Sequence, residues 1–299
     1  MRRWLAAATS SAGLVAERPE LWLPGALAWL AGLGWLPLLV AVVPAPSAGD
    51  LTFMGARLVT SGAWPWNAVL ICAVLLGVAL LAIVLAAAGE AELLAQAQRR
   101  RAAVAVSLRI AAIGGVTIVP TALLLAATVV GVAAVAPSEF NSPTPGPGPM
   151  VRTAARLAPV LMVLGLAMLA GSAYAAAAGR LAVWQRVAVA AALRAAPGAL
   201  LRAGSASVIH VLAAAGMRVA YLLLATLLLI VLWEPIGAQL RTDVGIDLAL
   251  GLLLVGFVAI WLCLVLGGGA MRAWESATWT RLLAERGPGP ERKEQTTHS

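Results

Sequence analysis

Charged side chains are scarce in this sequence. Asp, Glu, Lys and Arg make up 11% of the 299 residues, whereas a soluble domain of ordinary composition contains about a quarter. Hydrophobic residues make up 62%, and they form runs of about 20, the length that an α-helix needs to cross a bilayer. The composition therefore excludes an ordinary soluble domain and predicts an all-α polytopic membrane protein.

Cysteine and histidine are also rare, with two residues of each. Cys72 and Cys263 fall inside apolar runs without a Cys or His at metal-ligand spacing, so we predict two small buried side chains, no disulfide framework and no metal site. The chain has no H-E-x-x-H, G-x-S-x-G, Walker or Gly-rich dinucleotide motif. Because catalysis needs several polar side chains to converge, the sequence predicts no catalytic residue and no cofactor.

Acidic residues are outnumbered, 13 against 21 basic residues, and all but one of the basic residues are arginine. The basic residues flank the apolar runs, where anionic headgroups account for them, and no compact basic domain indicates nucleic acid as a partner. Counted along the alternate junctions of six spans, 16 of them fall on one side and four on the other. The positive-inside rule then predicts a multi-pass protein of the bacterial plasma (inner) membrane with both termini in the cytoplasm.

The apolar runs predict six membrane-spanning helices. Their approximate bounds are 21–43, 66–88, 110–136, 157–178, 208–233 and 246–270, the fifth with a start anywhere between 208 and 214. We expect Pro37 to bend the first span, Pro197 to break the segment after the fourth, and Pro235 to close the fifth. The Pro- and Gly-rich stretch 137–149 is predicted to be an exposed, mobile loop without helix or sheet.

Four segments beside the spans are predicted to be cytoplasmic amphipathic helices on the membrane surface: one at the amino terminus, the first connector at 90–109, the second connector at 180–203, and one at 270–286. Gly89, Gly179 and Gly269 end even-numbered spans at intervals of 90 residues. A single integral-membrane domain, 1–286, then divides into similar two-span units at about 1–89, 90–179 and 180–269. A terminal surface helix, 270–286, and a disordered tail, 287–299, follow. Chance alignment in an alanine-rich chain is the alternative to this repeat.

Two stretches resemble a known family. RPELWLPGALAWL near the start and RLAVWQRVAVAAALRAAPGALLR in the middle are similar to bacterial six-span proteins related to the integral-membrane domain of some glycerophosphodiester phosphodiesterases. Ala192-Leu193-Arg194 and Leu200-Leu201-Arg202 fit that family's short motif on an amphipathic helix between spans. The resemblance implies a fold more than an activity, because the phosphodiesterase chemistry of such proteins belongs to a separate soluble domain that this chain lacks.

Arg218 is a charged residue that falls well inside a predicted span. The 15 apolar residues from Val219 to Trp233 are too few to cross a bilayer, so the span must include this arginine. At a rise of about 1.5 Å per residue, Arg218 lies about 6 Å or about 15 Å inside, depending on where the span starts. The shallow position lets it snorkel, and the deep one demands a partner, for which Glu90 and Glu275 are the candidates. The alternative is that Arg218 and His210 together recognise a lipid phosphate or another anion.

The functional expectations follow from these features. Arg186, Arg194 and Arg202 of the second connector are predicted to contact anionic lipid headgroups, with docking of a cytoplasmic protein partner as the alternative. The leading hypothesis is a non-enzymatic membrane subunit or scaffold that handles lipid or supports transport. The alternatives are the permease subunit of a transporter driven by a separate ATPase, and an intramembrane lipid-modifying enzyme.

Overall fold

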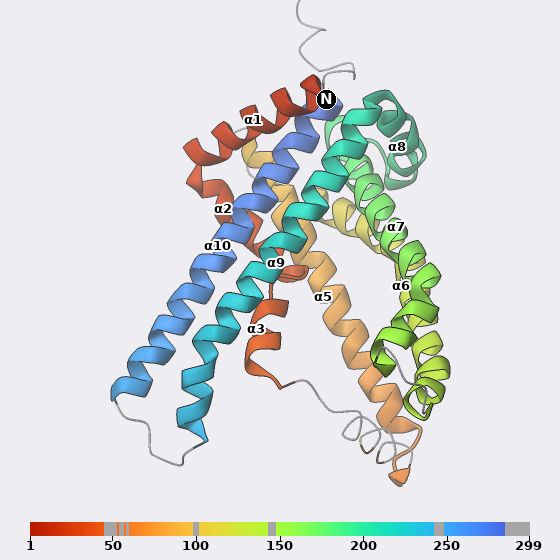
Figure 1. The fold of residues 1–299 in the computed structure, drawn as a ribbon. Coiled ribbons are helices and arrows are strands. Elements are labelled where there is room, and N and C mark those ends of the chain that lie inside the picture. The colour runs from red at the N-terminus through yellow and green to blue at the C-terminus, as the bar shows by residue number, and fades with distance from the viewer. Residues whose placement is uncertain are drawn as a thin grey trace, which may run out of the picture. The chain divides into compact units, whose positions relative to one another are not determined.

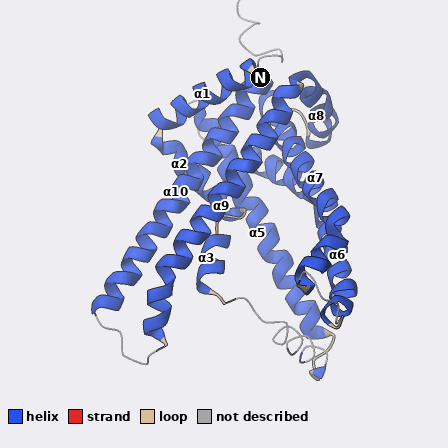
Figure 2. Cartoon of the chain, viewed as in Figure 1, coloured by secondary structure: helices blue, strands red, loops and turns tan. Residues whose placement is uncertain are grey.

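The computed structural model of the chain is built from helices, and its described residues contain no strand (Figures 1 and 2). It describes residues 1–44, 53, 57, 60–97, 102–142, 148–241 and 248–284. The helices are α1 (Arg2–Glu17), η1 (Pro19–Leu21), α2 (Trp22–Ala31), α3 (Leu36–Val42), α5 (Trp66–Ala97), α6 (Val104–Phe140), α7 (Pro149–Trp184), α8 (Val189–Ala203), α9 (Ser205–Leu240) and α10 (Leu248–Ala284). The all-α class is therefore confirmed. The predicted tail 287–299 and Arg99–Arg101 of the first connector lie outside the described residues.

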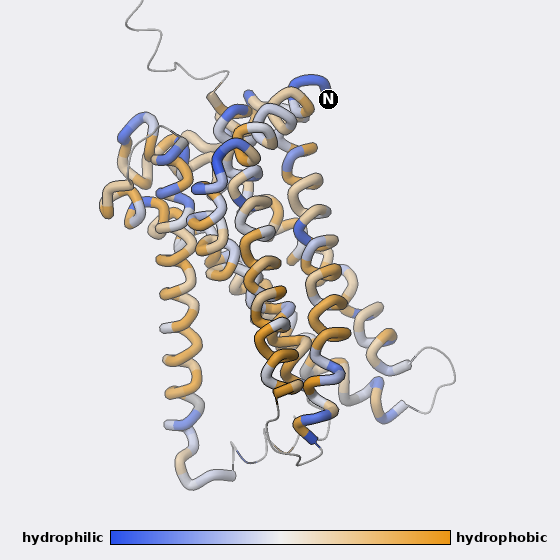
Figure 3. The backbone as a smooth tube through the Cα atoms, turned by 90° about the vertical axis from the view of Figure 1, so that its left-hand side faces the viewer, coloured by the Kyte–Doolittle hydropathy of each residue, from blue (hydrophilic) through white to orange (hydrophobic). Residues whose placement is uncertain are grey.

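Among the described residues, five helices are long and apolar enough to cross a membrane: α5, α6, α7, α9 and α10. Apolar residues line the length of these helices in Figure 3. A sixth candidate is the pair Pro19–Ala31 and Leu36–Val42, two apolar helices that meet at an angle of 57°. The chain thus has the helical, multi-pass architecture of a membrane protein, with five spans or, if the bent pair is one span, six.

The break in the first apolar run lies upstream of the predicted bend. The helix stops at Ala31, and Pro37 lies in the first turn of α3, where its missing N–H is not needed. In the turn between, the backbone N–H groups of Gly32 and Gly34 donate to the Trp29 carbonyl at 3.1 and 3.0 Å. The indole of Trp29 packs against this turn. A Cβ added at Gly34 would lie 2.5 Å from its Nε1, so only glycine fits there. The break therefore lies at the turn that contains Gly32 and Gly34, and Pro37 follows it in the first turn of α3.

Several predicted helix ends are wrong. Pro197 lies inside α8, and α9 continues through Pro235 to Leu240. The carboxyl end of α6 includes residues 137–140 of the stretch that we expected to be a loop, and α7 begins at Pro149. Residues 143–147 of that stretch lie outside the described residues. Proline inside a long helix is tolerated where other groups or a local adjustment satisfy the freed carbonyl, so it is a poor marker of helix ends here.

The three glycines that were predicted to end spans do not end helices. Gly89, Gly179 and Gly269 all lie inside continuous helices, namely α5, α7 and α10. The predicted terminal surface helix 270–286 is consequently the carboxyl end of α10, and the first part of the connector 90–109 belongs to α5. The three-unit repeat stays a prediction.

The described residues form two compact units. The first contains Met1 and described residues of 112–212 and of 279–284; the second contains described residues of 2–111 and of 213–278. In the first unit, α8 packs against α7 through alanines, and the Tyr174 hydroxyl donates to the Leu193 carbonyl at 2.7 Å. Because alanine faces let two helices approach closely, the alanines and the Tyr174 hydrogen bond together hold α8 against α7.

In the second unit, α2 packs between α5 and α10 at glycines. A Cβ on Gly89 would lie 2.6 Å from the Pro24 carbonyl oxygen, and one on Gly25 would overlap the Gly269 carbonyl. A Cβ on Gly268 would lie 2.5 Å from Trp29 Nε1. No larger residue fits at these crossings without moving backbone or the indole.

The two cysteines are exposed, which corrects the expectation that they are buried. Cys72 lies on α5, where neighbours such as Leu75 and Leu76 are exposed too. In a spanning helix an apolar side chain needs no burial within the protein, because lipid is as apolar as a protein core.

Candidate functional site

Arg218 on α9 forms a two-pronged ion pair with Glu275 on α10. Its Nε donates to Glu275 Oε2 at 3.1 Å, and its Nη2 donates to Glu275 Oε1. The Glu275 side chain is 8% exposed and that of Arg218 is 32% exposed. The structure thus brings Arg218 to one of the two carboxylates that the sequence nominated. Fork-to-carboxylate pairing of this kind gives both strength and a fixed geometry.

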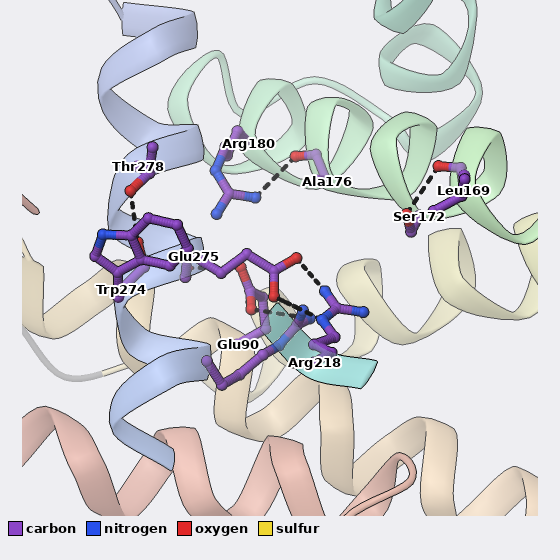
Figure 4. A network of polar contacts seen from close by, with 11 residues as sticks. Glu90, Leu169, Ser172, Ala176, Arg180, Arg218, Trp274, Glu275 and Thr278 are labelled. Atoms are coloured by element: carbon purple, nitrogen blue, oxygen red, sulfur yellow. Dashed lines mark hydrogen bonds and ion pairs between the residues drawn. The ribbon is translucent and has the colours of Figure 1, made fainter. Parts of the chain in front are cut away.

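A second arginine extends this pair to α5. Arg272 Nη1 donates to Glu275 Oε2 at 3.0 Å, and Arg272 Nη2 lies 3.4 Å from Glu90 Oε2. The Ser276 hydroxyl donates to Glu90 Oε1 at 2.8 Å. We call Glu90, Arg218, Arg272 and Glu275 the charged network; Figure 4 shows its contacts. Two carboxylates face two guanidinium groups, so the network is formally neutral.

The network lies directly beside the glycine crossings of the second unit. Glu90 follows Gly89 on α5, and Arg272 and Glu275 lie within two turns of Gly269 on α10. Positions three apart share one face of a helix, so Arg272 and Glu275 point the same way from α10. The glycines bring the helix backbones close, and this closeness lets side chains of α5, α9 and α10 meet.

The sequence missed the role of Arg272, which was counted only as a charge that sets orientation. A signal was present, because Arg272 and Glu275 have the spacing of an intrahelical ion pair. Nothing local indicated that Glu90, 182 residues away in the sequence, faces the same arginine. The helix that carries Arg218 also begins earlier than either predicted start, at Ser205.

His210 belongs to the first unit, whereas Arg218 belongs to the second. The imidazole of His210 is fully buried and meets the Trp279 ring edge to face, with centroids 4.9 Å apart and planes at 87°. Through this contact His210 of α9 packs against Trp279 of α10. It is a structural environment, of the kind that aromatic pairs form in cores.

Arg180 is a further departure from the sequence expectation. It was counted among the surface arginines of the second connector, yet it is 1% exposed. Its Nη1 donates to the Ala176 carbonyl at 3.0 Å (Figure 4). Its Nε donates to the Thr280 hydroxyl at 3.3 Å. Because α7 continues through this position to Trp184, Arg180 lies in the core of the first unit.

The other arginines of this connector are exposed. Arg186 lies in the turn before α8 with a backbone φ of 52°, and Arg194 and Arg202 lie on α8. Leu201, next to Arg202, is 81% exposed. The opposite side of α8 is buried and consists of Ala192, Ala196, Ala199 and Ala203. One side of α8 is therefore fixed to the protein, and the other presents arginine and leucine outward.

Within the part of the chain that the structure describes, no group of three or more His, Cys, Asp or Glu side chains is arranged to hold a metal ion. The charged network and the outer side of α8 are thus the two candidate sites, one internal and one external. Comparison of the chain with protein-family models, with curated proteins and with solved structures finds no match.

Proposed function

We propose that the chain is a non-enzymatic multi-pass membrane protein that serves as a subunit or scaffold and contacts anionic lipid. In this proposal η1, α2 and α3 form the first of six spans, and both termini face the cytoplasm of a bacterium. The 16-to-four asymmetry of basic residues supports this orientation.

The observation that carries the proposal is the pairing of Arg218 with Glu275. A charge in a spanning helix is costly and is by default a functional hypothesis. Here the guanidinium donates two bonds to a carboxylate of the same unit, and a second arginine completes the neutral network. This arrangement favours a structural ion pair that joins helices over a site that binds a substrate.

The lipid contact in this proposal is the outer side of α8. Arg194, Leu201 and Arg202 together offer cations for phosphate groups and an apolar side chain for the acyl boundary. Each arginine near an anionic surface contributes about 1 kcal/mol. The double variant R194Q/R202Q should therefore weaken binding of phosphatidylglycerol by roughly ten- to thirtyfold at low salt.

The test compares R218Q, R194Q/R202Q and wild type in neutral detergent, measuring both thermal stability and binding of fluorescent phosphatidylglycerol. We expect R218Q to lose stability and keep lipid binding, and R194Q/R202Q to do the reverse. If R218Q keeps its stability but loses lipid or anion binding, Arg218 is a ligand residue and the structural assignment is overturned.

A second candidate function is the permease subunit of a transporter driven by a separate ATPase. The observation that favours it is the position of α8, a 15-residue helix between the long apolar helices α7 and α9 with an exposed face. If an ATPase docks on this exposed face, the L201E substitution should weaken its binding. Co-purification of an ATPase with wild type but not with L201E, accompanied by ATP hydrolysis, would support this function over lipid contact alone.

A further inference from the structure

A second charged cluster lies in the first unit. Glu139, near the carboxyl end of α6, has a side chain that is only 4% exposed. Its Oε2 accepts from Arg152 Nε at 2.7 Å, and its Oε1 lies 2.7 Å from Arg156 Nε. Arg152 Nη2 also donates to the Glu139 carbonyl at 2.7 Å. We call these three residues the arginine clamp.

The arginine clamp carries an excess positive charge. One carboxylate faces two guanidinium groups, so the formal charge is +1 after internal pairing. The two arginines are not equivalent, because the Arg156 side chain is 63% exposed and that of Arg152 is 19% exposed. Arg152 is the inner, structural partner of Glu139. Arg156 uses its Nε for the same carboxylate and leaves much of its guanidinium accessible.

Exposed apolar side chains neighbour the clamp residues in the sequence. Phe140, Met150 and Val151 are all exposed, and they lie next to Glu139 and Arg152 in the sequence. An oriented cation beside exposed apolar side chains matches a molecule that has a phosphate at one end and acyl chains at the other. Free phosphate would use only the cation.

The position of Arg156 along α7 fits the level of lipid headgroups. Arg156 and Trp184, the last residue of α7, are 28 residues apart, or about 42 Å at a rise of 1.5 Å per residue. A bilayer with its headgroup regions is about 40–45 Å thick. A helix that crosses the membrane with its Trp184 end at one headgroup layer therefore carries Arg156 to the other.

We propose that the arginine clamp binds the phosphodiester of a phospholipid, with Arg156 as the residue that contacts the phosphate. The buried Glu139 orients Arg156 and prevents the two arginines from repelling each other. This inference rests on the proposed membrane location of the chain and assigns a second lipid site, at the end of α7 opposite α8.

The test measures binding of fluorescent phosphatidylglycerol to the full chain in neutral detergent. R156Q removes the exposed cation and keeps the Glu139–Arg152 pair, whereas R241Q removes an exposed arginine at the end of α9 and serves as the matched control. We expect R156Q to weaken binding about fivefold, R156K to restore most of it, and R241Q to leave it unchanged. Unlabelled phosphatidylglycerol and phosphatidylcholine should compete, and inorganic phosphate should compete far less.

Three outcomes would overturn the proposal. The first is equal binding by R156Q and wild type, and the second is an equal loss in R156Q and R241Q. The third is competition by inorganic phosphate as strong as that by phospholipid, which would make the clamp a site for free phosphate. If R194Q/R202Q loses lipid binding while R156Q keeps it, the clamp site fails and the proposed contact at α8 stands.

Discussion

Replacing Glu275 by glutamine tests the charged network most directly. Glutamine keeps the shape of the side chain but removes the negative charge, so it leaves Arg218 without its carboxylate and Arg272 with Glu90 alone. Glu275 takes part in three close contacts with the two arginines. Removing one partner of a buried ion pair costs about 3–5 kcal/mol. Because both arginines are about one-third exposed and glutamine still accepts one bond, we expect the lower end of this range, about 3 kcal/mol.

A loss of about 3 kcal/mol changes the folding equilibrium roughly 150-fold. It can be measured as the shift in SDS-induced unfolding of the purified protein in mixed micelles, followed by circular dichroism. The matched control is E234Q, because Glu234 is exposed on the same helix as Arg218. A surface substitution of this type should cost less than about 0.5 kcal/mol.

The double variant R218L/E275L separates pairing from burial. Replacing both members of an ion pair by apolar residues is often neutral, and Arg272 retains Glu90. We therefore expect the double variant to be more stable than E275Q. If E275Q is as stable as E234Q, or if the R218L and E275L effects simply add, the network does not join these helices in the way described.

Four further predictions concern packing, activity and orientation. Gly268→Ala should destabilise the protein by about 1–3 kcal/mol, because its Cβ would meet Trp29, whereas Gly77→Ala, with no atom within 4 Å of its Cβ, should not; thermal unfolding distinguishes the two. His210→Ala should cost about 1–3 kcal/mol through loss of the ring contact with Trp279 and the cavity left behind. The purified wild type should release no product from phospholipid, and a turnover that H210A abolishes would instead support an intramembrane enzyme. Reporters fused to either terminus should both read as cytoplasmic, and a signal from outside the cell at either end would refute the proposed orientation.

The long apolar helices could be predicted from the sequence because hydropathy is a local property. Each of the predicted spans from the second onward corresponds to one long apolar helix. The ends of these helices could not be predicted, because the usual terminators lie inside them. Pro235 is an example, since α9 continues past it to Leu240.

Side-chain partners were only partly accessible to sequence reasoning. Glu275 was nominated for Arg218 because few carboxylates lie near span ends, and that reasoning needs only composition. The contact between Arg272 and Glu90 depends on how α5 and α10 cross, and the burial of Arg180 depends on how α7 meets residues of α10. Such crossings are set by tertiary packing at glycine and alanine, which a single sequence does not reveal.

The seam between α2 and α10 has a consequence for biosynthesis. Gly25 and Gly269 are 244 residues apart, and α1 accepts a hydrogen bond at the Ala8 carbonyl from Trp274 of α10. At roughly 5–20 residues per second, about 12–50 s of translation separate the two halves of this seam. The first apolar segments therefore enter the bilayer well before their partner exists. If translation stalls before α10 is made, α1 and α2 remain without the helix against which they pack.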